Sequence, residues 1–111
     1  MPKKRQGIFG MVDLHDRPEE IRRLLYKGET LLLTKRGKAF AAITPIDKDS
    51  KLPRNTMIMG LSEVRENRDD FIFTLMNDKR IVLTYYGRAI GLVDHDIPKA
   101  LLKKHARSFS K

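Results

Sequence analysis

The chain has 111 residues, contains no cysteine and carries a formal net charge of +9. This length suits one domain, or two half-sized units that share a core, and the lack of cysteine excludes disulfides and thiolate metal sites. No apolar run approaches the ~20 residues of a membrane-spanning helix, and no long apolar stretch follows the basic first residues. We therefore expect a cytoplasmic protein with no signal peptide and no membrane partner.

The excess positive charge lies at the two ends of the chain. Lys3, Lys4 and Arg5 precede residue 10, and five cations without an acid follow residue 97. With those eight set aside, 15 of the 23 basic residues remain, against 14 acidic ones. Basic ends on a balanced body are typical of polyanion contact, most often with nucleic acid. The alternative is that the ends only keep the chain soluble.

The first half of the chain predicts, in order, a strand, a helix and a two-stranded hairpin, at 6–11, 16–28, and 31–34 with 38–44. Asp16 can cap the helix, Pro18 suits its first turn, and Gly28 can end it in a left-handed conformation. The two hairpin strands meet at Arg36-Gly37, where a glycine suits the positive φ of a tight turn.

The second half predicts the same order, with a strand at 57–59, helical signals over 61–76, and hairpin strands at 80–84 and 88–93. Tyr86-Gly87 lies at the hairpin turn. Of the adjacent tyrosines Tyr85 and Tyr86, we expect one to cover the core and one to be exposed, although both could instead stack on nucleic-acid bases. Residues 48–55 have the polar composition of a linker, and 97–111 predict a short basic helix and tail.

The two halves repeat each other at an offset of fifty residues with no gap. The identical pairs include Ile8/Ile58, Gly10/Gly60, Leu25/Leu75, Leu33/Leu83 and Thr34/Thr84. A unit of about 45 residues is close to the size below which a chain rarely buries enough apolar surface to fold alone. We therefore expect the units, at 6–47 and 56–96, to pack on each other as an intramolecular pseudo-dimer.

Two segments carry a resemblance to a known family. Residues 61–67, Leu-Ser-Glu-Val-Arg-Glu-Asn, resemble the Ser-Glu-x-Arg-x-Asn opening of the Phd/YefM antitoxin fold. Residues 32–45 resemble the terminal hairpin of that fold, and residues 82–93 fit it more loosely. The resemblance implies an α+β fold of two tandem Phd/YefM-like strand–helix–hairpin units. It also implies a DNA-binding transcriptional regulator, acting as a repressor or autoregulator.

The resemblance also implies which side chains contact DNA. In such antitoxins these are the arginine of the Ser-Glu-x-Arg motif and the basic residue after the strand threonine. By position they are Arg65 in the second unit and Lys35 in the first, whereas the other unit has His15 and Tyr85. Each unit thus keeps one half of the DNA-reading residues, which implies an asymmetric DNA site. The alternative function is an antitoxin that binds and neutralises a ribonuclease-like toxin.

The residues themselves favour contact with double-stranded DNA at the same places. Long cationic side chains gather at one hairpin turn and at the chain ends, where they can reach phosphates. The candidate DNA contacts are Arg65, Lys35, Arg36, Lys38, Arg88, Lys3, Lys4, Arg5, Lys103 and Lys104. Arg68, three residues after Arg65, is a weaker candidate. The alternative is that Arg65 pairs with Glu66, Asp69 or Asp70, and that the hairpin cations only protect an exposed turn.

The sequence gives little support for catalysis. Its three histidines are far apart, no cysteine can act as a nucleophile, and no glycine-rich phosphate loop is present. We therefore expect no enzymatic activity, no metal and no cofactor. Further self-association of the pseudo-dimer is left open.

Overall fold

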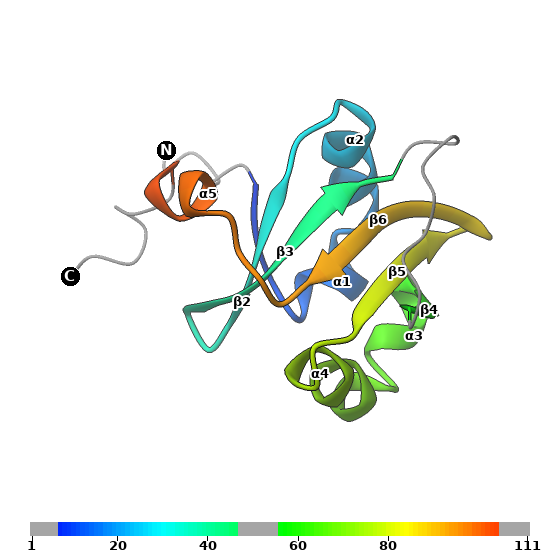
Figure 1. Cartoon of the computed structure of the whole chain (residues 1–111). Coiled ribbons are helices and arrows are strands. Elements are labelled where there is room, and N and C mark those ends of the chain that lie inside the picture. Colours follow the sequence, from blue (N-terminus) through cyan, green and yellow to red (C-terminus); the bar gives the residue numbers. More distant parts are fainter. Residues whose placement is uncertain (1–6, 47–55, 105–111) are drawn as a thin grey trace.

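A computed structural model describes residues 7–46 and 56–104, which form a mixed α/β structure with a six-stranded sheet and five helices (Figure 1). In chain order the elements are β1 (Ile8–Gly10), α1 (Asp13–Asp16), α2 (Pro18–Tyr26), β2 (Leu31–Lys35), β3 (Lys38–Pro45), β4 (Thr56–Gly60), α3 (Leu61–Val64), α4 (Arg68–Met76), β5 (Arg80–Tyr85), β6 (Arg88–Asp94) and α5 (Lys99–Lys104). The expected linker at 48–55 lies outside the described residues. So do Lys3, Lys4, Arg5 and the end of the tail from residue 105.

The strand order is β1-β2-β3-β6-β5-β4, so that the strands of the first half and of the second half lie side by side in one sheet. Strand β1 pairs with β2 in parallel, and β4 pairs with β5 in parallel. The register of the first pair, Ile8 opposite Leu32, recurs fifty residues later as Ile58 opposite Val82. Strands β3 and β6 join the two halves as an antiparallel pair.

Both hairpins are built in the same way. In each hairpin the strand register shifts by one residue just before the threonine, between Leu33 and Thr34 and again between Leu83 and Thr84. Arg36 and Gly37 have φ of 53° and 78°, and the equivalent residues of the second turn have φ of 51° and 76°. Positive φ at both central residues is the geometry of a type I′ turn, which matches the twist of the flanking strands. The turns expected at these positions are confirmed.

Each half contains two helices separated by a short break. The break falls at Arg17 (φ −128°, ψ 46°) in the first half and at Asn67 (φ −112°, ψ 33°) fifty residues later. The prediction of one helix over 16–28, capped by Asp16, is therefore wrong at its start. Asp16 ends α1, and its carboxylate lies 3.0 Å from Nδ1 of His15 instead of capping α2. Gly28 has φ of 89° after α2, as predicted.

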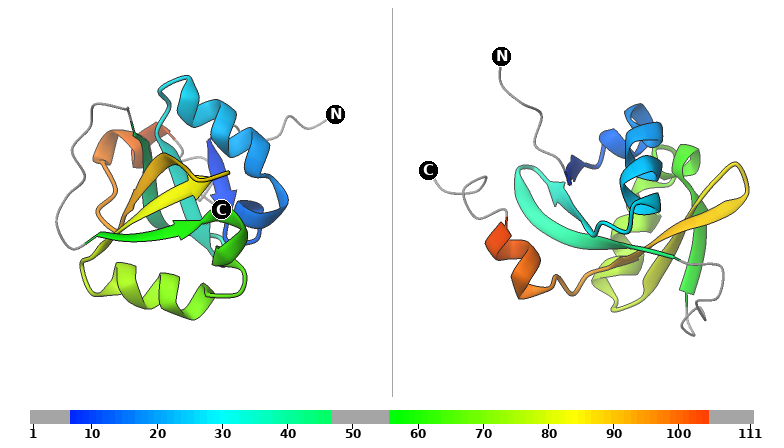
Figure 2. Two further views of the ribbon diagram at one scale, coloured as in Figure 1. Left: turned by 90° about the vertical axis from the view of Figure 1, so that its right-hand side faces the viewer. Right: turned by 90° about the horizontal axis from the view of Figure 1, so that it is seen from above.

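The two faces of the sheet are covered differently. Alternate strand residues such as Leu31, Leu33 and Ile43 face α1–α4 and form the main core with Leu14 and Phe71. Their neighbours on the opposite face, Leu32 and Ala42, pack with Leu101 of α5. Helix α5 thus lies across the sheet from α1 and α2 (Figure 1; Figure 2, right). Among the described residues, no helix is long and apolar enough to cross a membrane.

Candidate nucleic-acid interface

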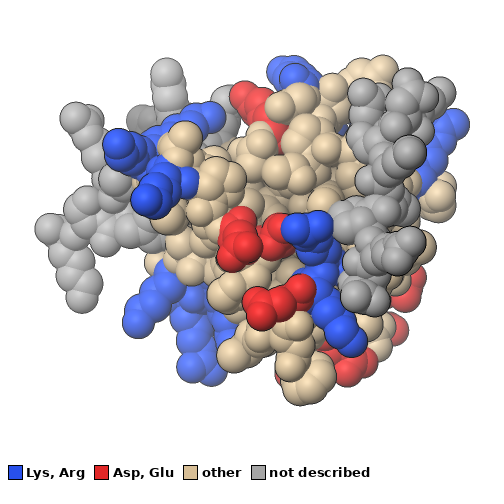
Figure 3. Space-filling model, in the orientation of Figure 1, with Lys and Arg blue, Asp and Glu red and all other residues tan. Residues whose placement is uncertain are grey.

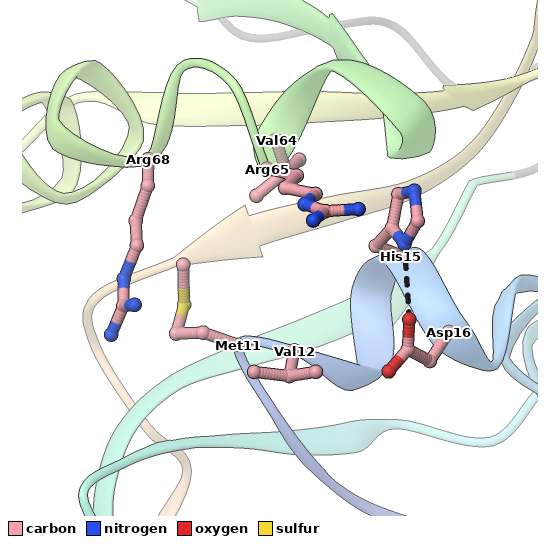
Figure 4. Close-up of a pocket in the computed structure, with 7 residues that line it drawn as sticks. All are labelled: Met11, Val12, His15, Asp16, Val64, Arg65 and Arg68. Atoms are coloured by element: carbon pink, nitrogen blue, oxygen red, sulfur yellow. Dashed lines mark hydrogen bonds and ion pairs between the residues drawn. The ribbon is translucent and has the colours of Figure 1, made fainter.

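A groove of about 320 Å³ lies where the two halves meet on the helical side of the sheet (Figure 4). One wall comes from α1 and the residues before it, the other from the end of α3 and the start of α4. The lining residues are Met11, Val12, His15, Asp16, Val64, Arg65 and Arg68. His15 and Arg65 are equivalent at the offset of fifty, so the groove lies between matching positions of the two halves.

Short-range contacts hold α1 and α3 in place. The backbone N–H of Gly10 donates a 2.8 Å hydrogen bond to Oδ2 of Asp13, and that of Gly60 donates a 3.3 Å bond to Oε1 of Glu63. These carboxylates satisfy a backbone donor at the start of each short helix. Leu14 and Val64 are buried in the core, which fixes both helices against each other. His15 and Arg65, one residue further along, consequently project at the surface.

The groove is lined by two arginines and one carboxylate, that of Asp16. Arg65 and Arg68 are exposed, and neither forms an ion pair with any residue that the structure describes. Pairing of Arg65 with Glu66, Asp69 or Asp70, the alternative considered from the sequence, is therefore not found. In Figure 4 the side chain of Arg65 extends toward His15, whose ring is engaged by Asp16. The groove thus offers two guanidinium groups to a ligand.

Three other arginines in the described part of the chain have structural partners. Arg17 pairs with Asp13 and Glu20 and stacks over the ring of Phe9 at 4.6 Å. Arg22 pairs with Glu19, and Arg80 with Asp94. Some described cations therefore form ion pairs that hold elements together. The seven DNA-contact candidates in the described ranges form no such ion pair with a described residue.

The β2–β3 turn carries three of these candidates. Arg36 and Lys38 are exposed. Lys35 is half-buried, and its Nζ lies 5.7 Å from the centre of the Phe40 ring, which favours the cation by its π electrons. A cation held in this way is poorly placed to move freely to a base edge. Arg36 and Lys38 are therefore the more available charges of this turn.

The β5–β6 turn lies at the opposite end of the sheet (Figure 1). Arg88 and Tyr86 are exposed there, and Tyr86 keeps 87% of its surface. Tyr85 packs on the main core and donates a 2.8 Å hydrogen bond to Oε1 of Glu19 in α2. The expected division between one core tyrosine and one exposed tyrosine is confirmed.

The Tyr85–Glu19 hydrogen bond changes the acidity of both groups. It is the main reason why the pKa of Tyr85 rises from its ordinary 10.0 to about 12. The same bond, followed by Arg22, lowers the pKa of Glu19. A hydroxyl that donates to a carboxylate is harder to ionise, and a carboxylate that accepts is easier to ionise. This bond ties the hairpin of the second half to a helix of the first.

The lysines of the C-terminal helix lie apart from the groove. Lys103 and Lys104 belong to α5, which covers the opposite face of the sheet. In Figure 3, Lys and Arg side chains gather around α5 and below it, around the β2–β3 turn. The candidate DNA contacts therefore do not form one patch. They fall into the groove, the two turns and α5.

The sequence indicates some of the groove but not all of it. Arg68 lines it beside Arg65, although the sequence favours Arg68 only weakly. Arg65 follows α3 and Arg68 begins α4, so the two residues do not lie on the face of one helix. Met11 and Val12 give the groove an apolar wall that no sequence motif indicates.

Within residues 7–46 and 56–104, no group of three or more His, Asp or Glu residues gathers as metal ligands. Comparison of the chain with protein-family models, with curated proteins and with solved structures gave no match.

Proposed function

We propose that the protein is a DNA-binding transcriptional regulator whose contact surface is centred on the groove between α1 and α3. The observation that carries this proposal is the exposed, unpaired state of Arg65 and Arg68, which line different parts of that groove (Figure 4). Unpaired guanidinium groups on a rigid frame bind phosphates, and they can bind O6 and N7 of guanine with two hydrogen bonds. Within the chain, by contrast, the structural arginines are already neutralised.

We further propose that the two halves are Phd/YefM-like units acting as an intramolecular pseudo-dimer. The repeated strand register, the repeated turns and the equivalent helix breaks support this reading. In such an arrangement, His15 and Arg65 approach the two halves of one DNA site from matching positions. Because the two side chains differ, the preferred site is asymmetric at the bases they contact.

The arrangement of the cations refines which of them act together. A duplex lying against the surface around the groove faces the helical side of the sheet, whereas Lys103 and Lys104 lie on the opposite side. The proposal therefore assigns Arg65, Arg68 and the β2–β3 turn to the main contact. The α5 lysines then contribute a weaker, sequence-independent attraction.

The test is fluorescence anisotropy with the DNA upstream of the gene and a shuffled duplex of equal length, across a salt series. We expect tighter binding to the upstream DNA and an affinity that falls steeply with salt. Equal affinity for both duplexes would reduce the proposal to non-specific DNA binding. No binding near physiological salt would overturn it and would favour a protein target, such as the toxin of an antitoxin pair.

A further inference from the structure

Helix α4 has an apolar outer surface that its counterpart α2 lacks. At equivalent positions, α2 has Arg22, Arg23 and Tyr26, whereas α4 has Ile72, Phe73 and Met76. Phe73 is 69% exposed and Met76 is 64% exposed. The buried face of α4, with Phe71 and Leu75, is already satisfied by the core. Ile72 is half-buried and packs against the core, whereas the exposed Phe73 and Met76 do not serve the packing of the chain itself.

Strand β4, next to α4, is the edge of the sheet in the second half. Its sequence Thr-Met-Ile-Met-Gly contains no charge and no proline, the usual features that keep edge strands from pairing with other strands. Met57 and Ile58, on opposite faces of the strand, are 38% and 64% exposed. The equivalent of Ile58 in the first half, Ile8, packs instead against the cluster of β2, β3 and α5.

The edge strand and the helix form one continuous surface. Met57 and Phe73 line the same shallow groove, which also contains Asp70 and Lys79. The hydroxyl of Thr74 donates to Sδ of Met57 at 3.7 Å, which holds the strand against the helix. The surface therefore combines an apolar centre with one acidic and one basic side chain.

We propose that this α4–β4 surface binds a second copy of the same chain about a two-fold axis. In such a two-fold interface, when residue i of one copy contacts residue j of the other, residue j of the first copy also contacts residue i of the second. We expect Asp70 of each copy to face Lys79 of the other. Strand β4 of one copy runs antiparallel to β4 of the next and continues the sheet. The chain already joins its own halves by an antiparallel strand pair of this kind, β3 with β6.

The exposed apolar surface is large enough for a weak dimer. Phe73, Met76, Met57 and Ile58, at roughly 200 Å² for each large side chain, leave about 450 Å² exposed on one copy. Two copies bring about 900 Å², and the strand backbones and polar rim raise the total toward the ~1,200 Å² at which specific interfaces begin. We expect a dimer that forms at high protein concentration and dissociates on dilution.

The experiment is sedimentation equilibrium of the full chain in the absence of DNA, from about 10 μM to 1 mM, the range for a small interface. The expected result is a mass that rises from 12.9 kDa toward twice that value. Phe73→Arg introduces the residue found at the equivalent position in α2. Ile58→Lys places a charge on the edge strand. Each should raise the dissociation constant at least ~10-fold.

Tyr26→Arg is the matched control, because Tyr26 is 87% exposed on the counterpart helix. It should leave the dimer unchanged, and circular dichroism checks that every variant is folded. A wild-type mass that stays at 12.9 kDa throughout would overturn the proposal. So would a dimer that withstands both Phe73→Arg and Ile58→Lys. Since no DNA is present, neither result depends on the proposed DNA binding.

Discussion

Ile43 and Val93 are equivalent residues of the two halves, and they lie directly opposite each other in the β3–β6 pair. Both are fully buried. The neighbouring pairs are also related by the offset of fifty: Ala42 lies opposite Asp94 on one side, and their equivalents Leu92 and Thr44 lie opposite each other on the other side. The internal two-fold relation of the sheet thus passes through the Ile43–Val93 pair. These two side chains connect the halves at the centre of the core.

Replacing Ile43 with alanine should therefore destabilise the whole chain as one unit. A buried isoleucine truncated to alanine typically costs about 2–5 kcal/mol, because transfer energy is lost and a cavity remains. The measurement is urea unfolding followed by circular dichroism. Ile58→Ala, at a residue that is 64% exposed, is the control, and at low protein concentration it should change stability by less than about 0.5 kcal/mol. Equal effects of the two variants would contradict the central role of Ile43.

Gly91 should not tolerate a side chain, for reasons of space. A Cβ at this position would lie 2.7 Å from Cγ2 of Ile43 and 2.9 Å from Cδ1 of Leu25. Overpacking of this kind costs about 1–3 kcal/mol, so Gly91→Ala should lower the free energy of unfolding by that amount. Ala89→Ser, at an exposed position of the same strand, is the control and should be nearly neutral. A stability of Gly91→Ala equal to wild type would show that helix α2 can move away.

The repeat explains how much of this fold is predictable from sequence. Glycines at 37 and 87, between apolar runs, indicate both hairpins, and the turns have the expected geometry. The offset of fifty matches the strand register of both halves residue by residue. Such features are local, or follow from comparing one half with the other. Sequence patterns report both kinds well.

Other features depend on tertiary packing and are not visible in the sequence. The break between α1 and α2 falls at Arg17, whose guanidinium is held by Asp13, Glu20 and the ring of Phe9. Asp78 adopts φ of 59° after α4. The equivalent residue after α2 is Gly28, whose identity predicts a positive φ, whereas an aspartate does not. The groove of the candidate site requires α1 and α3 to pack together. No motif within either half encodes that contact.

The hydrogen bond from Tyr85 to Glu19 should make the stability of the protein depend on alkaline pH. Because the pKa of Tyr85 is raised to about 12 in the folded chain, the protonated phenol is the form that folding favours. This contribution is fully present below the ordinary pKa of 10.0 and is lost as the pH rises toward 12. Thermal unfolding from pH 8 upward should show this decline, and Tyr85→Phe should remove it.

Titration of the tyrosines by ultraviolet absorbance checks the cause directly. A tyrosine that ionises near pH 12, well above the ordinary pKa of 10.0, should be present in the wild type and absent from Tyr85→Phe. Glu19→Gln keeps a hydrogen-bond acceptor but removes the negative charge, so Tyr85 should then ionise at a lower pH. If the titration curve is the same with and without the Glu19 carboxylate, the raised pKa has another origin.

Substitutions of the groove arginines and of the α5 lysines should affect DNA binding differently. Arg65→Ala and Arg68→Ala should each cost about 1–3 kcal/mol of binding where the arginine reads a base, and less where it contacts only phosphate. Lys103→Ala with Lys104→Ala, on the opposite face of the sheet, should weaken all duplexes alike and reduce the salt slope. Anisotropy titrations against upstream and shuffled DNA distinguish these patterns.

His15→Arg tests whether the site is asymmetric because the two halves differ at this one position. Arg65 and His15 are equivalent at the offset of fifty and line the same groove, so the variant presents matching guanidinium groups to both halves of the DNA. Selection from a random DNA pool should then yield more symmetric sites than the wild type selects, with guanine favoured at both ends. The opposite exchange, Arg65→His, should lose the guanine preference of the second half. Identical selected sites for all three proteins would mean that neither residue reads a base, and the sequence preference would have to come from the hairpin turns.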